Sequence, residues 1–151
     1  MTVAFSLHAS YELCFAEYSG TVSVDELVAL SDFLAAQPTL LSYDTLSWIA
    51  PGADFSAFDP TALDAMFARY RTLFQPLNLV ILRRGAWVCD SPACEPYLER
   101  WLGEPDLRKT LSSDVRRFPN IQAAAEWLLL DSGKAAVVAR REGFRELARF
   151  G

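Results

Sequence analysis

The sequence predicts a single α/β domain built on one mixed, largely parallel sheet. Two observations support this prediction. Short apolar runs alternate along the chain with segments in which apolar residues recur every three or four positions. Most segments of the second kind begin with a serine, aspartate or asparagine, which is the usual start of a helix. Strands that alternate with helices need crossover connections, and these give parallel strands covered by helices.

Two predicted strands open the chain as an antiparallel hairpin. Residues 3–7 alternate weakly between apolar and polar side chains. The segment "YELCFAEYSG" then places Leu13 and Phe15 among polar residues, and Gly20 ends it. The intervening "HAS" is short enough for a hairpin turn, so these strands would add an antiparallel edge to the sheet.

The first predicted helix lies in "SVDELVALSDFLAAQP". Ser23 and Glu26 have the spacing of a capping box, and Asp25 lies in the positive first turn of the helix. Pro38 ends the segment. The apolar face of this helix comprises Leu27, Leu30, Phe33 and Leu34.

The next predicted strand is "YDTLSWIA", residues 43–50, which breaks at Pro51 and Gly52. The second helix is predicted to begin at Asp59, because an aspartate cap followed by proline at the first helical position is a strong start signal. Its apolar stripe comprises Leu63, Met66, Phe67, Tyr70 and Phe74.

The remaining elements follow the same alternation. "LNLVILRR", residues 77–84, predicts a buried strand, and Ser91 with Pro92 predicts the start of a third helix that stops at Gly103. "KTLSSDVRRF", residues 109–118, predicts a polar edge strand, and Asn120 caps a fourth helix. The predicted order is therefore two strands, a helix, and then three strand–helix pairs.

The length of 151 residues fits one domain with a single core. We assign residues 1–130 to the α/β domain and residues 131–151 to a short C-terminal helical extension. Phe144, Leu147 and Phe150 would give the extension an apolar face. That face is expected to dock on the body of the domain or on another subunit.

Composition and charge disfavour several functions. The net charge is -5 and no long basic block occurs, which argues against nucleic acid as a partner. No apolar run approaches the roughly 20 residues of a membrane span. Three cysteines without an export signal predict reduced thiols and a cytoplasmic location. With His8 as the single histidine, neither a metal site nor a serine or cysteine hydrolase is favoured, and we expect no cofactor and no enzymatic activity.

The order of elements resembles that of the STAS-like family, with "AEYSGTVSVDEL" leading into the first helix and "YDTLSWIA" into the second. This family includes bacterial anti-sigma-factor antagonists and the cytoplasmic domains of sulfate transporters. The stand-alone SpoIIAA-like bacterial proteins are the most similar branch, in which a strand ending in glycine precedes the first helix, as Gly20 does here. The resemblance covers about residues 3–130, and it implies a non-enzymatic domain that binds a protein partner or itself. The fold is also structurally similar to CRAL-TRIO lipid-transfer domains.

The resemblance draws attention to the loop "DFSAFDPTAL". In the anti-sigma-factor antagonists this loop carries an Asp-Ser-Ser/Thr-Gly pattern whose serine is phosphorylated by a partner kinase. Ser56 and Thr61 are the hydroxyls available here, but no hydroxyl–glycine pair follows them and Pro60 occupies the turn. Ser56 is therefore the candidate phosphorylation site, and a plain loop hydroxyl is the alternative interpretation.

Seven residues are the candidates for a ligand or partner site. The carboxyl ends of parallel strands form the usual ligand edge of an α/β sheet, so the loops after the third and fourth strands should share one crevice. Arg84 offers a fork for a carboxylate or phosphate and Trp87 an apolar wall. The alternatives are a helix cap for Asp59, a turn residue for Asp54 and a solvated arginine for Arg84. The seven candidates are Asp54, Ser56, Asp59, Thr61, Arg84, Trp87 and Ser91.

Two functions are expected from these features. The first is a regulatory module that binds an unknown protein partner or forms a homodimer through the loop at residues 54–61 and the second and third predicted helices. The second is a module that binds a small apolar molecule or lipid in a pocket between helices and sheet. An internal cavity would favour the second function, and a solid core with an exposed apolar patch would favour the first.

Overall fold

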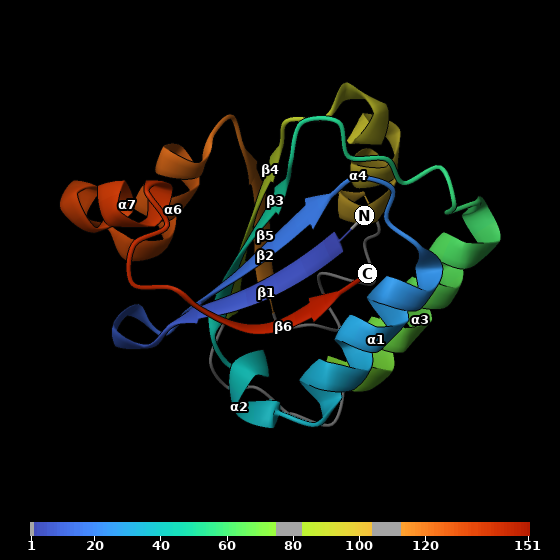
Figure 1. The fold of residues 1–151 in the computed structure, drawn as a ribbon, viewed down its shortest axis with the longest axis horizontal. Coiled ribbons are helices and arrows are strands. Elements are labelled where there is room, and N and C mark those ends of the chain that lie inside the picture. The colour runs from blue at the N-terminus through green and yellow to red at the C-terminus, as the bar shows by residue number, and fades with distance from the viewer. Residues whose placement is uncertain (1, 75–82, 104–112) are drawn as a thin grey trace.

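The computed structural model describes residues 2–74, 83–103 and 113–151. In this part of the chain the fold is α/β, with one mixed six-stranded sheet in the order β5-β4-β3-β2-β1-β6 (Figure 1). Strands β2 to β5 are parallel to one another, whereas β1 is antiparallel to both of its neighbours. The strands are β1 (Thr2–His8), β2 (Leu13–Ser19), β3 (Asp44–Ile49), β4 (Arg83–Cys89), β5 (Ser113–Phe118) and β6 (Arg145–Phe150).

Helices cover both faces of the sheet (Figure 1). Because β2 to β5 follow one another in the sheet, right-handed crossovers place all the connecting helices on one face. Helices α6 and α7 lie on the opposite face. None of the helices in the described residues is long and apolar enough to cross a membrane. The helices are α1 (Val24–Ala35), α2 (Pro38–Leu41), α3 (Pro60–Phe74), α4 (Glu95–Leu102), α6 (Ile121–Leu129) and α7 (Ser132–Ala139), and the short 3-10 turns are η1 (Ala9–Tyr11) and η3 (Pro92–Cys94).

Alternation along the strands divides the interior into two cores. In β2, Cys14 and Tyr18 pack in the core beneath α1, α3 and α4. Leu13 and Phe15 point the other way and pack with α6 and α7. This is the period-two pattern of a strand whose two faces are both covered.

Three of the predicted helix starts are confirmed by their caps. Ser23 and Glu26 form the capping box in both directions, with N–O distances of 3.1 and 3.3 Å. The Asp59 carboxylate accepts the backbone N–H of Ala62 at 2.8 Å. Asn120 accepts the backbone N–H of Ala123 at 2.8 Å. Each cap satisfies a backbone donor that the first helical turn leaves unpaired.

The C-terminal extension differs from the prediction. One or two short helices were expected in residues 131–151, but α7 ends at Ala139 and Arg145–Phe150 forms β6. Gly143 adopts a left-handed φ of 78°, which turns the chain back towards the sheet. Strand β6 then pairs with β1, so the hairpin does not form the sheet edge and the extension docks within its own chain. Leu147 and Phe150 pack against the core, as their apolar character indicated.

Strand β4 also differs from the prediction. The strand was placed at residues 77–84, of which 77–82 lie outside the described residues, and the segment after Arg84 was expected to be a loop. Instead Arg83–Cys89 is a central strand, hydrogen-bonded in register with β3 and β5. Ala86 and Val88 are fully buried on one face, and Trp87 lies on the other. The predicted strand at 109–118 has its described part in β5.

Candidate functional site

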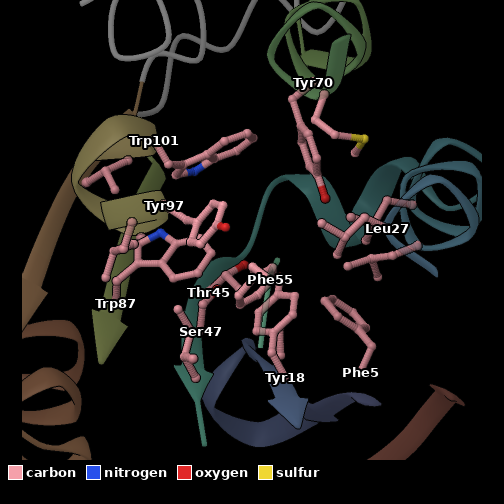
Figure 2. Close-up of a pocket in the computed structure, with 18 of the residues that line it drawn as sticks. Phe5, Tyr18, Leu27, Thr45, Ser47, Phe55, Tyr70, Trp87, Tyr97 and Trp101 are labelled. Carbon is pink, nitrogen blue, oxygen red and sulfur yellow. The ribbon is translucent and has the colours of Figure 1, made fainter. Parts of the chain in front are cut away.

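A cavity of about 140 Å³ lies between the sheet and the helices α1, α3 and α4 (Figure 2). Strands β2, β3 and β4 form its floor, and it is partly open to the exterior. Aromatic side chains make up much of its wall, and Figure 2 shows them converging on the space from the sheet and from the helices. These aromatic residues are Phe5, Tyr18, Phe55, Phe58, Tyr70, Trp87, Tyr97 and Trp101.

The cavity exists because the floor is made of small side chains. Ala16, Thr45, Ser47 and Gly85 come from three adjacent strands and line it together. A Cβ atom added at Gly85 would meet only the Val115 side chain, at an ordinary contact distance of 3.7 Å. Large aromatic rings stand around these small residues, and their rigid planes do not fill the centre.

Two phenol groups supply polar atoms to this apolar space. Burial raises the pKa of Tyr18 far above its ordinary value, and a hydrogen bond from Ser47 opposes that shift. Tyr70 keeps some accessible surface beside the cavity, yet protein surrounds it and desolvation raises its pKa to about 12. Both hydroxyls are therefore protonated at neutral pH and are able to donate hydrogen bonds. Figure 2 shows Tyr70 reaching from α3 towards the sheet.

Arg83 brings a positive charge to the cavity wall. Its Nε donates to the Tyr43 carbonyl at 3.1 Å, and its Nη2 donates to the Thr45 hydroxyl at 3.1 Å. Burial lowers the pKa of Arg83, an effect opposed by the neighbouring Cys14, Tyr70 and Asp44. A guanidinium nevertheless keeps its proton in proteins, so Arg83 is a cation whose orientation these two hydrogen bonds help to fix.

Arg84, the arginine predicted for the site, lies on the opposite face of β4. Its backbone N–H and its Nη2 bind the two oxygens of Asp44 at 2.8 and 3.1 Å. Its guanidinium also donates to the carbonyls of Trp127 and Leu128 at the end of α6. Arg84 therefore ties β3 and β4 to α6, and it does not line the cavity.

The four predicted residues in the loop at 54–61 cluster at the start of α3. Asp54 accepts the backbone N–H of Ser56 at 2.7 Å and the Ser56 hydroxyl at 3.0 Å, which is a local turn. Asp59 caps α3, and Thr61 is exposed in its first turn. The Asp54 backbone also bonds to Gly20 and Val22, so β2 and this loop are joined. These four residues lie outside the lining of the cavity.

The last two predicted residues, Trp87 and Ser91, have different surroundings. Trp87 lines the cavity and stacks on Tyr18, with ring centroids 5.8 Å apart. Ser91 is buried and donates to the Ala53 carbonyl at 2.6 Å, which leaves it with a structural contact. Of the seven candidates, Trp87 alone lines the cavity. Tyr18, Tyr70 and Arg83 were missed, although Arg83 stands four positions before Trp87, a spacing that places both on one face of a strand.

Neither a metal centre nor a disulfide is found in the described part of the chain. No group of three or more histidine, cysteine, aspartate or glutamate side chains there has the arrangement to hold a metal ion. Cys14, Cys89 and Cys94 are all thiols. Comparison of the chain with protein-family models, with curated proteins and with solved structures finds no match.

Proposed function

We propose that this protein is a binding module that holds a small apolar molecule in the cavity between the sheet and α1, α3 and α4. The observation that supports the proposal is the cavity itself, which combines apolar walls with a few fixed polar groups. This combination is typical of small-molecule sites, where apolar contact provides affinity and polar groups fix orientation. A cavity of about 150 Å³ in another protein accommodates benzene, so a ring-sized ligand suits the space.

The cavity lowers the stability of the fold, and its presence despite this loss also supports a function. An enclosed unfilled space in a core costs about 24 cal/mol per Å³, which gives an upper bound of roughly 3 kcal/mol for this partly open cavity of 140 Å³. Stability of a small domain is commonly only about 5–15 kcal/mol. We propose holding rather than turnover of the ligand, because the described lining residues include neither a carboxylate nor an imidazole to act as a general base.

A protein-binding function is the second expectation, and we rank it below ligand binding. Among the described residues Leu130 is the one strongly exposed large apolar side chain, and it lies between α6 and α7, remote in the chain from the loop at residues 54–61. An apolar patch that would mark a partner surface at that loop is thus lacking in this part of the chain. We further propose STAS-like membership, since the helix and strand order up to α6 matches the order on which that resemblance depends.

The test is a variant that fills the cavity. We expect 2-phenylethanol to bind the wild-type protein saturably and to shift the NMR signals of residues that line the cavity. Gly85→Val should abolish this binding, because its added side chain projects into the space beside Val115. Ser6→Val is the matched control: it adds valine to the same sheet on the face away from the cavity, opposite Phe15.

The results that would support the proposal differ from those that would overturn it. Binding that is lost in Gly85→Val and kept in Ser6→Val supports the proposal. Absence of saturable binding to the wild-type protein, or equal binding to Gly85→Val, would overturn it. Native mass spectrometry of protein purified from its own host adds an independent readout, because a retained small molecule would appear as extra mass.

A further inference from the structure

Thr45 lies in the floor of the cavity, and its hydroxyl is a polar group that a bound ligand can reach (Figure 2). The sheet pairs Thr45 with Gly85 on β4, which has no side chain, and with Cys14 on β2, whose thiol approaches the Leu40 carbonyl. The neighbours on both sides thus leave room above Thr45. Thr45 itself is only 9% exposed, so its hydroxyl is sheltered from bulk solvent.

The Thr45 hydroxyl already accepts one hydrogen bond, which leaves its own hydrogen as a donor. Nη2 of Arg83 lies 3.1 Å from Oγ1 of Thr45, and because a guanidinium has donors only, the hydroxyl oxygen is the acceptor in this contact. Among the described residues, no acceptor lies within hydrogen-bonding distance of the Thr45 hydroxyl. A sheltered donor without an acceptor is unfavourable, and a ligand that brings an acceptor would satisfy it.

We infer, on the basis of the proposed function, that the ligand is a small neutral aromatic carbonyl compound whose oxygen accepts a hydrogen bond from Thr45. A carbonyl oxygen accepts without donating, so it matches a hydroxyl whose oxygen is already engaged and whose hydrogen is not. An ionised group matches this position less well, because one hydroxyl does not replace the hydration shell of an ion.

The walls of the cavity favour a ring for the rest of the ligand. Trp87, Tyr97 and Trp101 stand around the space together with Tyr18 and Phe55 (Figure 2). Tyr18 stacks on Trp87 at 5.8 Å and is tilted against Phe55 at 5.9 Å, so both kinds of ring contact already occur in this wall. The volume of about 140 Å³ matches one ring with a short substituent.

The experiment compares acetophenone with ethylbenzene, in which a methylene group replaces the carbonyl group. Calorimetry should show that Thr45→Val weakens acetophenone binding about fivefold or more, because valine has the shape of threonine and leaves the carbonyl without its donor. The same variant should not weaken ethylbenzene binding. Thr45→Ser keeps the hydroxyl and should retain most of the acetophenone affinity. Ser6→Val is the matched control, since it replaces a hydroxyl by valine on the other face of the sheet and should change neither affinity.

A second readout follows the hydrogen bond directly. The infrared carbonyl band of bound acetophenone should lie at lower frequency in the wild-type protein than in Thr45→Val, as expected when a hydroxyl donates to the carbonyl. If Thr45→Val does not fold, Thr45→Ala removes the same hydroxyl and takes its place in both measurements.

Three results would overturn the inference and leave the proposed function standing. They are equal effects of Thr45→Val on both compounds, failure of acetophenone to bind where 2-phenylethanol binds, and tighter binding of benzoate, the charged analogue, than of acetophenone. Failure of acetophenone, ethylbenzene and 2-phenylethanol to bind the wild-type protein would overturn the inference and the proposed function together.

Discussion

Cys14 and Tyr70 show at the scale of single residues how strongly side chains are desolvated on this side of the core. Cys14 is fully buried beneath α2, where its thiol approaches the Leu40 carbonyl at 4.0 Å. Burial raises the pKa of Cys14 from 9.0 to about 12, and that of Tyr70 from 10.0 to about 12. Both groups therefore keep their protons in the native state at pH values where an exposed thiol or phenol would begin to lose them. Alkaline pH is therefore a direct probe of this region.

We predict that the free energy of unfolding falls as pH rises from about 9 towards 12. In this window the unfolded chain releases protons that the native chain retains, so the unfolded state is favoured as pH increases. The loss should reach about 1 kcal/mol or more by pH 10, measured by urea unfolding at pH 8, 9 and 10. Cys14→Ala removes the group with the larger shift in pKa and should make stability depend less steeply on pH. An unchanged slope in that variant would show that Cys14 is not the titrating group.

Two adjacent arginines explain why the candidate site was predicted only in part. Arg83 and Arg84 are chemically identical, and only the start and register of β4 decide which one faces the cavity. The predicted strand ended at Arg84, which left Trp87 in a loop where the alternation of faces does not apply. Trp87 was predicted as an apolar wall in the loop after the fourth strand, and it lines the cavity from within β4 instead. Tyr18 and Tyr70 were assigned to strand and helix stripes, because a sequence does not reveal that the small residues opposite them leave a hollow.

At the scale of elements, one turn connects helix α7, which covers the sheet on the same face as α6, to the edge strand β6. Gly143 has a φ of 78°, and a Cβ atom there would lie 2.5 Å from Nε2 of His8. His8 is not able to move aside easily, since it stacks on Tyr11 at 3.8 Å and contacts Phe144 edge-on at 5.3 Å. Its Nδ1 also accepts the backbone N–H of Tyr11. The histidine thus closes the hairpin end of β1 against this turn.

We predict that Gly143→Ala destabilises the protein more than Gly52→Ala, although both glycines have the same φ of 78°. Gly52 has open space around its Cβ position, so alanine there should cost only the backbone strain of about 1–2 kcal/mol. The clash with His8 should add about 1–3 kcal/mol at Gly143. Urea unfolding of the two variants measures the difference. The His8→Ala, Gly143→Ala double variant should remove most of the excess, and equal costs for the two single variants would contradict the steric argument.

Helix starts were predictable and two strands were not, for physical reasons that differ. Ser23, Asp59 and Asn120 cap their helices through atoms three residues away, so the signal lies within one short window of sequence. Strand β6 depends on the unpaired edge of β1, more than a hundred positions away in the chain. Its residues include Arg145, Glu146 and Arg149, which are exposed and resemble those of a surface helix. Pairing partners of this kind are not visible in a local pattern.

At the scale of the whole molecule, the two faces of the sheet have different packing. The face beneath α6 and α7 is closed to solvent at its centre, where Leu46, Ala86, Val88 and Ala124 are completely inaccessible. The face beneath α1, α3 and α4 contains the cavity. Burial on the closed face stabilises the sheet, whereas the cavity on the other face is energetically unfavourable. This division matches the general conflict between stability and function at binding sites.

We therefore predict that the Gly85→Val variant is more stable than the wild-type protein although it no longer binds 2-phenylethanol. Filling part of the cavity recovers some of the cost of the space, which is at most roughly 3 kcal/mol, and replacing glycine within a strand contributes about 0.5–1 kcal/mol more. The free energy of unfolding, measured in urea without ligand, should rise by about 1–3 kcal/mol.

The Ser6→Val control separates the two contributions, because it changes strand propensity without reaching the cavity. A gain in Gly85→Val that exceeds the gain in Ser6→Val by more than about 1 kcal/mol, the contribution of replacing glycine, would assign the excess to the filled space. A loss of stability in Gly85→Val would mean that the residues around Val115 already occupy the volume. In that case the cavity would not be an unfavourable space held open for a ligand. A Gly85→Val variant that is more stable than the wild-type protein and does not bind would show instead that the candidate site lowers the stability of this fold.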